Sequence, residues 1–118
     1  MKTIANAPID LRDRTLLFSK EVIRFAKPLY RIRAAQAVID QLIRSSTSIG
    51  ANFVEAKNAS SKRDFRNKVF ISKKEASETM YWLKVVEEFT DDPMLTSLQN
   101  ECQEIILILQ RIISPLNH

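Results

Sequence analysis

Glycine is almost absent from this chain, and its scarcity restricts the folds that the chain can adopt. The 118 residues contain one glycine, Gly50, and four prolines. Tight β-hairpin turns depend on glycine at positions of positive φ, so a sheet of short hairpins lacks its turn residues here. We therefore expect an all-α protein with short loops. Its length is that of a single domain, residues 1–118, with a core of its own.

Apolar residues recur at three- and four-residue spacing in four segments. This pattern predicts helices over about residues 9–27, 32–57, 61–89 and 93–116. Pro28 should end or distort the last turn of the first helix, because proline lacks the N–H of a helix interior. Ser61 with Asp64 should cap the third helix, and Asp92 with Pro93 should start the fourth. The fourth helix has a heptad pattern typical of a bundle, at Leu95, Leu98, Cys102, Ile105, Leu109, Ile112 and Leu116.

The segment SSTSIGANFVEA (residues 45–56) contains the glycine and four hydroxyl residues. It has the residue types of a catalytic loop. However, the apolar residues before and after it fall on the same face of one continuous helix. A helical glycine costs about 1 kcal/mol relative to alanine, and close approach of a neighbouring helix would explain it. We expect Asn52 and Glu55 to bond the third helix, near Lys73, Lys74 or Glu78 and Tyr81. The proposed structural polar network is Ser48, Asn52, Glu55, Glu75 and Glu78.

The inventory of reactive side chains favours a protein without catalytic activity. The only histidine is His118, so Ser-His-Asp chemistry and Glu-x-x-His metal pairs lack a placed histidine. A hydrolytic site of carboxylates alone is the open alternative. Cys102 falls on a predicted core face, and one cysteine cannot form an internal disulfide. We expect no catalytic residue, metal or cofactor, and a soluble cytoplasmic protein without a membrane segment.

Charge is divided unevenly along the chain. Residues 1–74 hold 16 Lys and Arg against 6 Asp and Glu, whereas residues 75–118 hold 2 against 8. This split is typical of a solvated surface or of a protein that binds a polyanion. Asp64 is the only acid in the basic cluster of residues 57–74, whose cations are Lys57, Lys62, Arg63, Arg66, Lys68, Lys73 and Lys74.

We expect this basic cluster to bind RNA or DNA through phosphates, with little sequence preference. Up-down packing would bring Arg12, Arg14 and Arg111 to the same end of the bundle. Few aromatic residues lie between the cations, so base stacking is not expected. The alternative is a protein-interaction scaffold whose basic residues neutralise an acidic partner.

Apolar residues outside the core pattern of the third and fourth helices favour an oligomer. A monomer rarely leaves such a patch exposed, although a long helix with a wide buried face is the alternative. The predicted interface residues are Ile71, Trp82, Leu107 and Ile108.

Two stretches resemble a known family. QLIRSSTSIGANFVEA (residues 41–56) and SSKRDFRNKVFISKKEASETMYWLKVV (residues 60–86) are similar to the bacterial four-helix-bundle family named for a protein encoded in an intervening sequence of 23S ribosomal RNA genes. Ala56 stands where many members have glycine. The resemblance implies a left-handed up-down-up-down bundle, a ring-like homopentamer and no catalytic role. Some relatives carry a ribosomal-protein label. Others are accessory proteins of reverse transcriptases in diversity-generating retroelements, so nucleic acid and a polymerase are the partners it implies.

Overall fold

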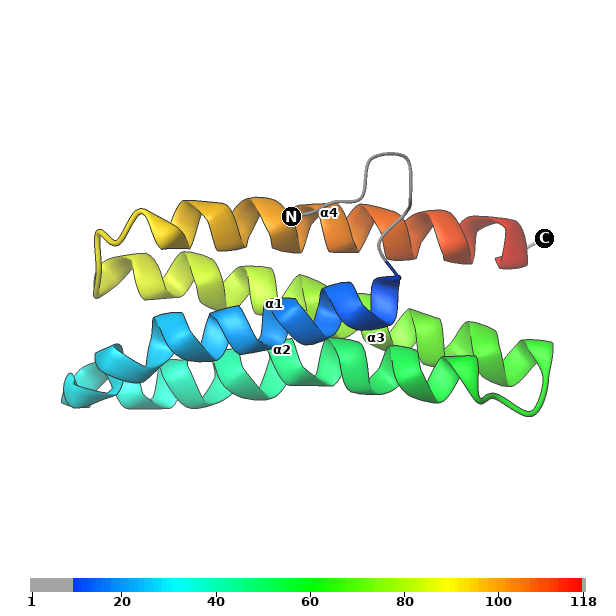
Figure 1. Cartoon of the computed structure of the whole chain (residues 1–118), viewed down its shortest axis with the longest axis horizontal. Helices are drawn as coiled ribbons and strands as arrows, with labels where there is room; N and C mark the ends of the chain where they lie inside the picture. The colour runs from blue at the N-terminus through cyan, green and yellow to red at the C-terminus, as the bar shows by residue number, and fades with distance from the viewer. Residues whose placement is uncertain (1–9, 118) are drawn as a thin grey trace.

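Four long antiparallel helices make up the computed structural model, which describes residues 10–117. They are α1 (Leu11–Ala26), α2 (Gln36–Lys57), α3 (Lys62–Val85) and α4 (Met94–Ile113). The chain runs up and down through them in order, and the described residues contain no strand (Figure 1). Short 3-10 helices follow or precede them at Lys27–Arg31, Arg33–Ala35, Val86–Glu88 and Ser114–Asn117.

Capping side chains set the starts of three helices. The Asp10 carboxylate accepts from the Arg12 N–H at 2.9 Å, and the Asp92 carboxylate accepts from the Met94 N–H at 2.9 Å. The Ser61 hydroxyl accepts from the Asp64 N–H at 3.0 Å, as its N-cap position predicts. The first helix changes to 3-10 geometry at Lys27, directly before Pro28.

The second helix starts later than the sequence pattern predicts. Ile32 has an extended backbone with φ −86° and ψ 111°, which reverses the chain between two 3-10 turns. Regular α-helix therefore begins at Gln36 instead of residue 32. The expected starting residue of the first helix, Ile9, lies outside the described residues, as does His118.

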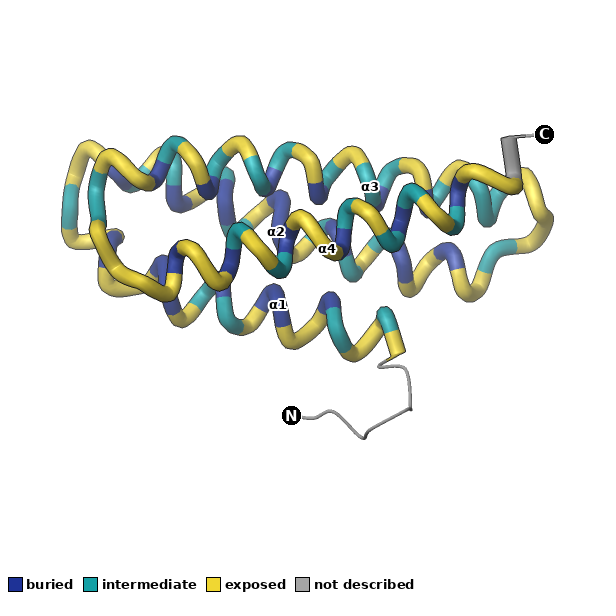
Figure 2. Tube along the Cα trace, turned by 90° about the horizontal axis from the view of Figure 1, so that it is seen from above, coloured by how far each residue is buried: buried dark blue, intermediate teal, exposed yellow. Residues whose placement is uncertain are grey.

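The predicted apolar faces meet in one core, and burial follows the helices along their whole length (Figure 2). One position differs at the end of α4, where Ile113 is buried and Ile112 is only partly buried. Cys102 is a core residue as expected; burial raises the pKa of its thiol to about 12. The fully buried apolar side chains include Phe18, Val22, Ile39, Leu42, Ile49, Val69, Leu83, Ile105 and Leu109.

Buried hydroxyls join the helices without leaving unsatisfied polar atoms. Ser72 of α3 donates to the Ile49 carbonyl of α2 at 2.7 Å, and Thr79 donates to the Ser45 hydroxyl at 2.9 Å. No buried side-chain N or O atom in the described part of the chain lacks a hydrogen-bond partner. Of the hydroxyl residues at 45–48, the Ser45 side chain therefore bonds α3, whereas the others bond carbonyls within α2.

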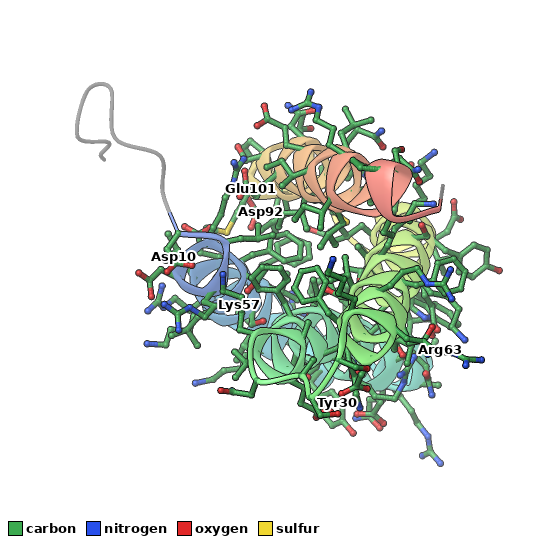
Figure 3. All side chains as sticks on the ribbon, turned by 90° about the vertical axis from the view of Figure 1, so that its right-hand side faces the viewer. Asp10, Tyr30, Lys57, Arg63, Asp92 and Glu101 are labelled. Atoms are coloured by element: carbon green, nitrogen blue, oxygen red, sulfur yellow. The ribbon has the colours of Figure 1, made fainter. Side chains whose placement is uncertain are left out.

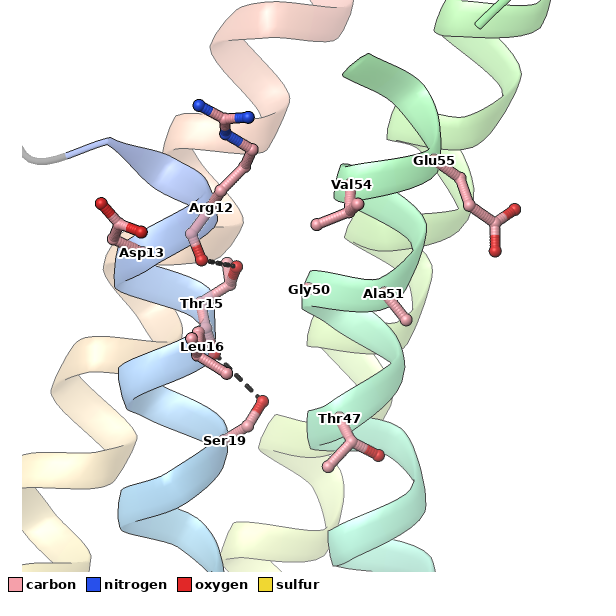
Figure 4. Close-up of a pocket in the computed structure, with 10 residues that line it drawn as sticks. All are labelled: Arg12, Asp13, Thr15, Leu16, Ser19, Thr47, Gly50, Ala51, Val54 and Glu55. Carbon is pink, nitrogen blue, oxygen red and sulfur yellow. Dashed lines mark hydrogen bonds between the residues drawn. The ribbon is translucent and has the colours of Figure 1, made fainter. Parts of the chain in front are cut away.

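Gly50 faces α1 at close range. A Cβ added there would lie 2.9 Å from the Thr15 hydroxyl oxygen and 3.3 Å from the Thr15 Cβ. The close helix approach expected from this glycine is confirmed, and the neighbour is α1 of the same chain (Figure 4).

Candidate nucleic-acid interface

The basic cluster lies at the α2–α3 connection and along the first half of α3. Lys57 and Arg63 project from the end of the bundle that faces the viewer in Figure 3. Lys57, Lys62, Arg63 and Lys74 are exposed, and the remaining three cations are half-buried. Four of the seven cations are therefore open to a large ligand.

Most cations of the basic cluster form no ion pair among the described residues, although Lys57 lies near Asp10 and Lys74 near Glu78. Lys68 pairs with Glu55, with 2.8 Å between the ammonium nitrogen and a carboxylate oxygen, and this bond raises the pKa of Lys68. Within residues 10–117, the other six cations form no ion pair. Their positive charge is left for solvent or for an anionic partner.

Two of the three arginines expected to enlarge this cluster are neutralised instead. Arg14 binds Glu101 at 2.6 Å and Glu104 at 2.8 Å, which ties α1 to α4. The hydrogen bond with Glu101 raises the pKa of the Arg14 guanidinium. Arg12 binds Asp10 at 2.8 Å. Of the three, Arg111 alone is exposed without an ion pair among the described residues.

Arg44 organises the acids of the predicted polar network, although the sequence pattern did not single it out. Its guanidinium contacts Glu75 at 3.3 Å and also binds Glu78. The Trp82 indole N–H donates to Glu78 at 3.0 Å. The Trp82 and Arg44 bonds together lower the pKa of Glu78. Arg44 lies one helical turn before Ser48 on the flank of α2 that faces α3. This four-residue spacing could have placed Arg44 in the predicted polar network.

Asn52 and Glu55 have different partners from those expected. The Asn52 amide donates to the Ser48 carbonyl at 2.8 Å, and the Ser48 hydroxyl donates to the Arg44 carbonyl, so both bonds stay within α2. Glu55 does cross to α3, but it reaches Lys68 and not Lys73 or later residues. Antiparallel helices pair residues that lie near their connecting loop, and Lys68 is closer to the 58–61 loop than Lys73, Lys74 or Glu78 is.

The Glu78 bonds give stability a defined pH dependence. Glu78→Gln should lower the free energy of unfolding at pH 7 by at most about 1 kcal/mol, because both partners are part-exposed. The folded-state pKa lies below the ordinary 4.5, so the stabilisation is present above that value and is lost as pH falls through the folded pKa. In urea titrations, the difference from wild type should shrink as pH falls below 4.5 and close as Glu78 becomes protonated in the folded protein. Glu88→Gln is the control. A difference in free energy of unfolding between wild type and Glu78→Gln that grows as pH falls contradicts the assignment.

An open groove of about 800 Å³ lies between α1 and α2. Leu16, Ala51 and Val54 supply apolar surface beside Gly50, as Figure 4 shows. Leu16 is 54% exposed and Val54 is 44% exposed. The groove was not predictable from the sequence pattern, because it depends on how α1 packs beside α2.

The four predicted interface residues differ in exposure. Leu107 on α4 is 46% exposed, whereas Ile71, Trp82 and Ile108 are half-buried within the single chain. Trp82 also packs against the hydrophobic core. Leu107 is thus the member of this set with the most apolar surface left for another subunit.

The described residues contain no group of three His, Cys, Asp or Glu side chains arranged to hold a metal ion. In the same part of the chain, every helix is too short or too polar to cross a membrane.

The fold and the site define a small four-helix bundle with a basic cluster, mostly without ion pairs in the described residues, at the α2–α3 connection and along the first half of α3. The family described as 23S rRNA-intervening sequence protein matches residues 9–111, and the chain belongs to that family. The chain is also similar to a crystal structure of a protein of unknown function from the S23 ribosomal protein family of Bacteroides thetaiotaomicron. The two share 36% identity over 89% of this chain and 99% of that one, with a TM-score of 0.82. No curated protein matches the chain.

Proposed function

We propose that this protein is a non-enzymatic protein that binds nucleic acid through its basic cluster. The observation that carries the proposal is the set of six cations that form no ion pair within residues 10–117. Neighbouring cations along α3 repel each other, and a polyanion relieves that repulsion. Phosphates of RNA or DNA supply negative charge at the close, regular spacing that such a surface fits.

The position of the cluster on α3 strengthens this proposal. Lys62 and Arg63 occupy the first turn of α3, and Arg66 follows in the second. Cations near a helix N-terminus oppose the helix dipole, at a cost of about 0.3–1 kcal/mol each. The same helix end attracts anions, so phosphate binding turns this unfavourable arrangement into a favourable one.

A second run of cations is a weaker candidate. Its members, at the end of α1 and in the α1–α2 connection, are Lys20, Arg24, Lys27, Arg31 and Arg33. The α1–α2 and α3–α4 connections share one end of the bundle (Figure 1). The α3–α4 connection carries the exposed acids Glu87, Glu88, Asp91 and Asp92, which oppose an anionic ligand at that end.

Salt dependence of binding tests the proposed function. Filter binding of the wild-type protein to a duplex should show log affinity falling linearly with log salt, with a slope of about −0.9 for each phosphate contact. With four contacts, affinity should fall roughly 100-fold between 50 and 200 mM salt. No binding at low salt, or an affinity that does not change with salt concentration, contradicts the proposal.

We also propose that the protein assembles as a ring-like homopentamer. A ring uses heterologous contacts, in which two different patches of each subunit meet. Two separate apolar patches support this arrangement, the groove beside Leu16 and Val54 and the outer surface of α4 at Leu107. Repeating the basic cluster around a ring would raise the total affinity for a long nucleic acid.

Light scattering on the purified protein should give about 68 kDa, five times the 13.6 kDa chain. Leu107→Glu should shift this mass toward 13.6 kDa while helix content is retained, because Leu107 is exposed in the single chain. A wild-type mass of 13.6 kDa contradicts the ring proposal.

A protein-interaction scaffold is the second candidate, favoured by the apolar groove between α1 and α2. Its partner would be a reverse transcriptase or another protein, with no direct role for nucleic acid. Purification from the native host, followed by identification of bound protein and nucleic acid, separates the two. Bound protein without nucleic acid supports the scaffold.

A further inference from the structure

One continuous face of α3 points away from the bundle core and carries aromatic and basic side chains in alternation. Every residue on it is exposed, and the positions alternate by four and three, as one face of a helix requires. We call this the α3 outer face. It consists of Arg63, Asn67, Phe70, Lys74, Ser77, Tyr81 and Lys84.

The two aromatic rings on this face are unusually open to solvent. Phe70 is 54% exposed and Tyr81 is 60% exposed. Tyr81 meets Trp82 edge to face, with ring centroids 5.0 Å apart and planes at 78°. Because Trp82 is itself bonded to Glu78, the Tyr81 ring is supported from one side and presents surface to the other.

The charge on this face has one sign. Arg63, Lys74 and Lys84 are its ionised residues, and none of its seven positions is acidic. The nearest carboxylates on the α2-facing flank, Glu75 and Glu78, are bound by Arg44. A ligand lying along the α3 outer face would therefore meet cations at intervals with aromatic rings between them.

We propose that the α3 outer face binds single-stranded nucleic acid, with Phe70 and Tyr81 stacking on unpaired bases. The inference rests on the proposed function and names its ligand class. Proteins that bind single strands combine cations along the backbone with aromatic platforms for the bases. Duplex bases are already stacked on each other and cannot use such platforms, so Phe70 and Tyr81 should distinguish single strands from duplexes.

The spacing of the rings sets the length of strand required. Phe70 and Tyr81 are eleven positions apart, or about 16 Å along α3 at 1.5 Å per residue. That span is at most about five nucleotides, because 3.4 Å is the rise of a fully stacked strand and an unstacked strand extends further per nucleotide. A strand of 12 nucleotides is long enough to reach both rings and to continue toward Arg63, away from the exposed acids Glu87 and Glu88.

Binding of two labelled probes tests this inference, a 12-nucleotide deoxythymidylate strand and a 12-base-pair duplex. Fluorescence anisotropy at 100 mM salt should show that wild type prefers the single strand. Phe70→Leu/Tyr81→Leu keeps the exposed apolar surface but removes the aromatic faces. It should lower single-strand affinity by about 10-fold or more and leave duplex affinity within about 3-fold. Leu17→Ala, at an exposed apolar position on α1, is the control and should bind as wild type does.

Three outcomes overturn the inference. A leucine double variant that binds the single strand as wild type does contradicts stacking but leaves the proposed function intact. A change of molecular mass in that variant shows that the α3 outer face joins subunits. A wild-type protein that binds neither probe contradicts the proposed function, and this inference with it.

Discussion

Replacing Lys62, Arg63 and Arg66 with glutamine should lower nucleic-acid affinity by about two to three powers of ten at 100 mM salt. Each neutralised phosphate contributes just under one power of ten at that concentration through counterion release. The slope of log affinity against log salt should flatten by about 0.9 for each phosphate that the variant no longer neutralises. Filter binding of wild type and variant over a salt series measures both quantities.

The triple variant should fold normally. Lys62 and Arg63 are exposed, and none of the three cations forms an ion pair within the described residues. Its free energy of unfolding should equal or exceed that of wild type, since cations are removed from the start of α3.

A matched variant controls for the reduced net charge. Lys20→Gln/Arg24→Gln/Lys27→Gln removes three exposed cations from α1 and the turn after it. This control should change the affinity only a few-fold. Equal reductions in affinity for both triple variants would mean that net charge alone attracts the nucleic acid, which contradicts a defined site on α3.

Gly50→Ala should destabilise the protein, although alanine is the better helix former by about 1 kcal/mol. The added Cβ would lie 2.9 Å from the Thr15 hydroxyl oxygen, and Thr15 is fully buried. Thr15 also donates to the Leu11 carbonyl at 2.8 Å, which limits its movement. Separating α1 from α2 at this contact should cost roughly 1–3 kcal/mol, and Gly50→Leu should cost more.

A double-mutant cycle identifies the cause. Urea titrations should show that Gly50→Ala is harmful in the wild type but neutral or stabilising when Thr15 is alanine, because the clashing hydroxyl is gone. If Gly50→Ala stabilises the wild type by the full propensity difference, the close contact is not what keeps glycine at this position.

Apolar spacing was sufficient to predict the helices and most of their buried faces. Its errors fall where the chain leaves ideal helix geometry. The extended backbone of Ile32 delays α2, and the end of α4 buries Ile113 in place of Ile112. The start of α2 depends on how the chain turns between packed helices, which apolar periodicity does not describe.

The candidate site was predictable in composition but not in electrostatics. The cations of the basic cluster are adjacent in sequence, so their grouping follows from the helix they occupy. Neutralisation of Arg14 by Glu101 depends instead on the packing of α1 against α4. Glu55 and Lys68 both lie near the 58–61 loop, so a partner for Glu55 early in α3 was predictable, although the sequence does not determine which residue it is. The spacing of Phe70 and Tyr81 is also visible in the sequence. Base stacking was not expected, because few aromatic residues lie between the cations.

The location of bound nucleic acid is the central claim, and lysine footprinting tests it most directly. The complex with a 12-nucleotide single strand would be acetylated briefly, and mass spectrometry would compare each lysine with the free protein. We predict protection of Lys62, Lys73 and Lys74, with Lys20 and Lys27 labelled as in the free protein. Protection confined to Lys20 and Lys27, or equal labelling of all lysines in a saturated complex, would contradict binding at the basic cluster.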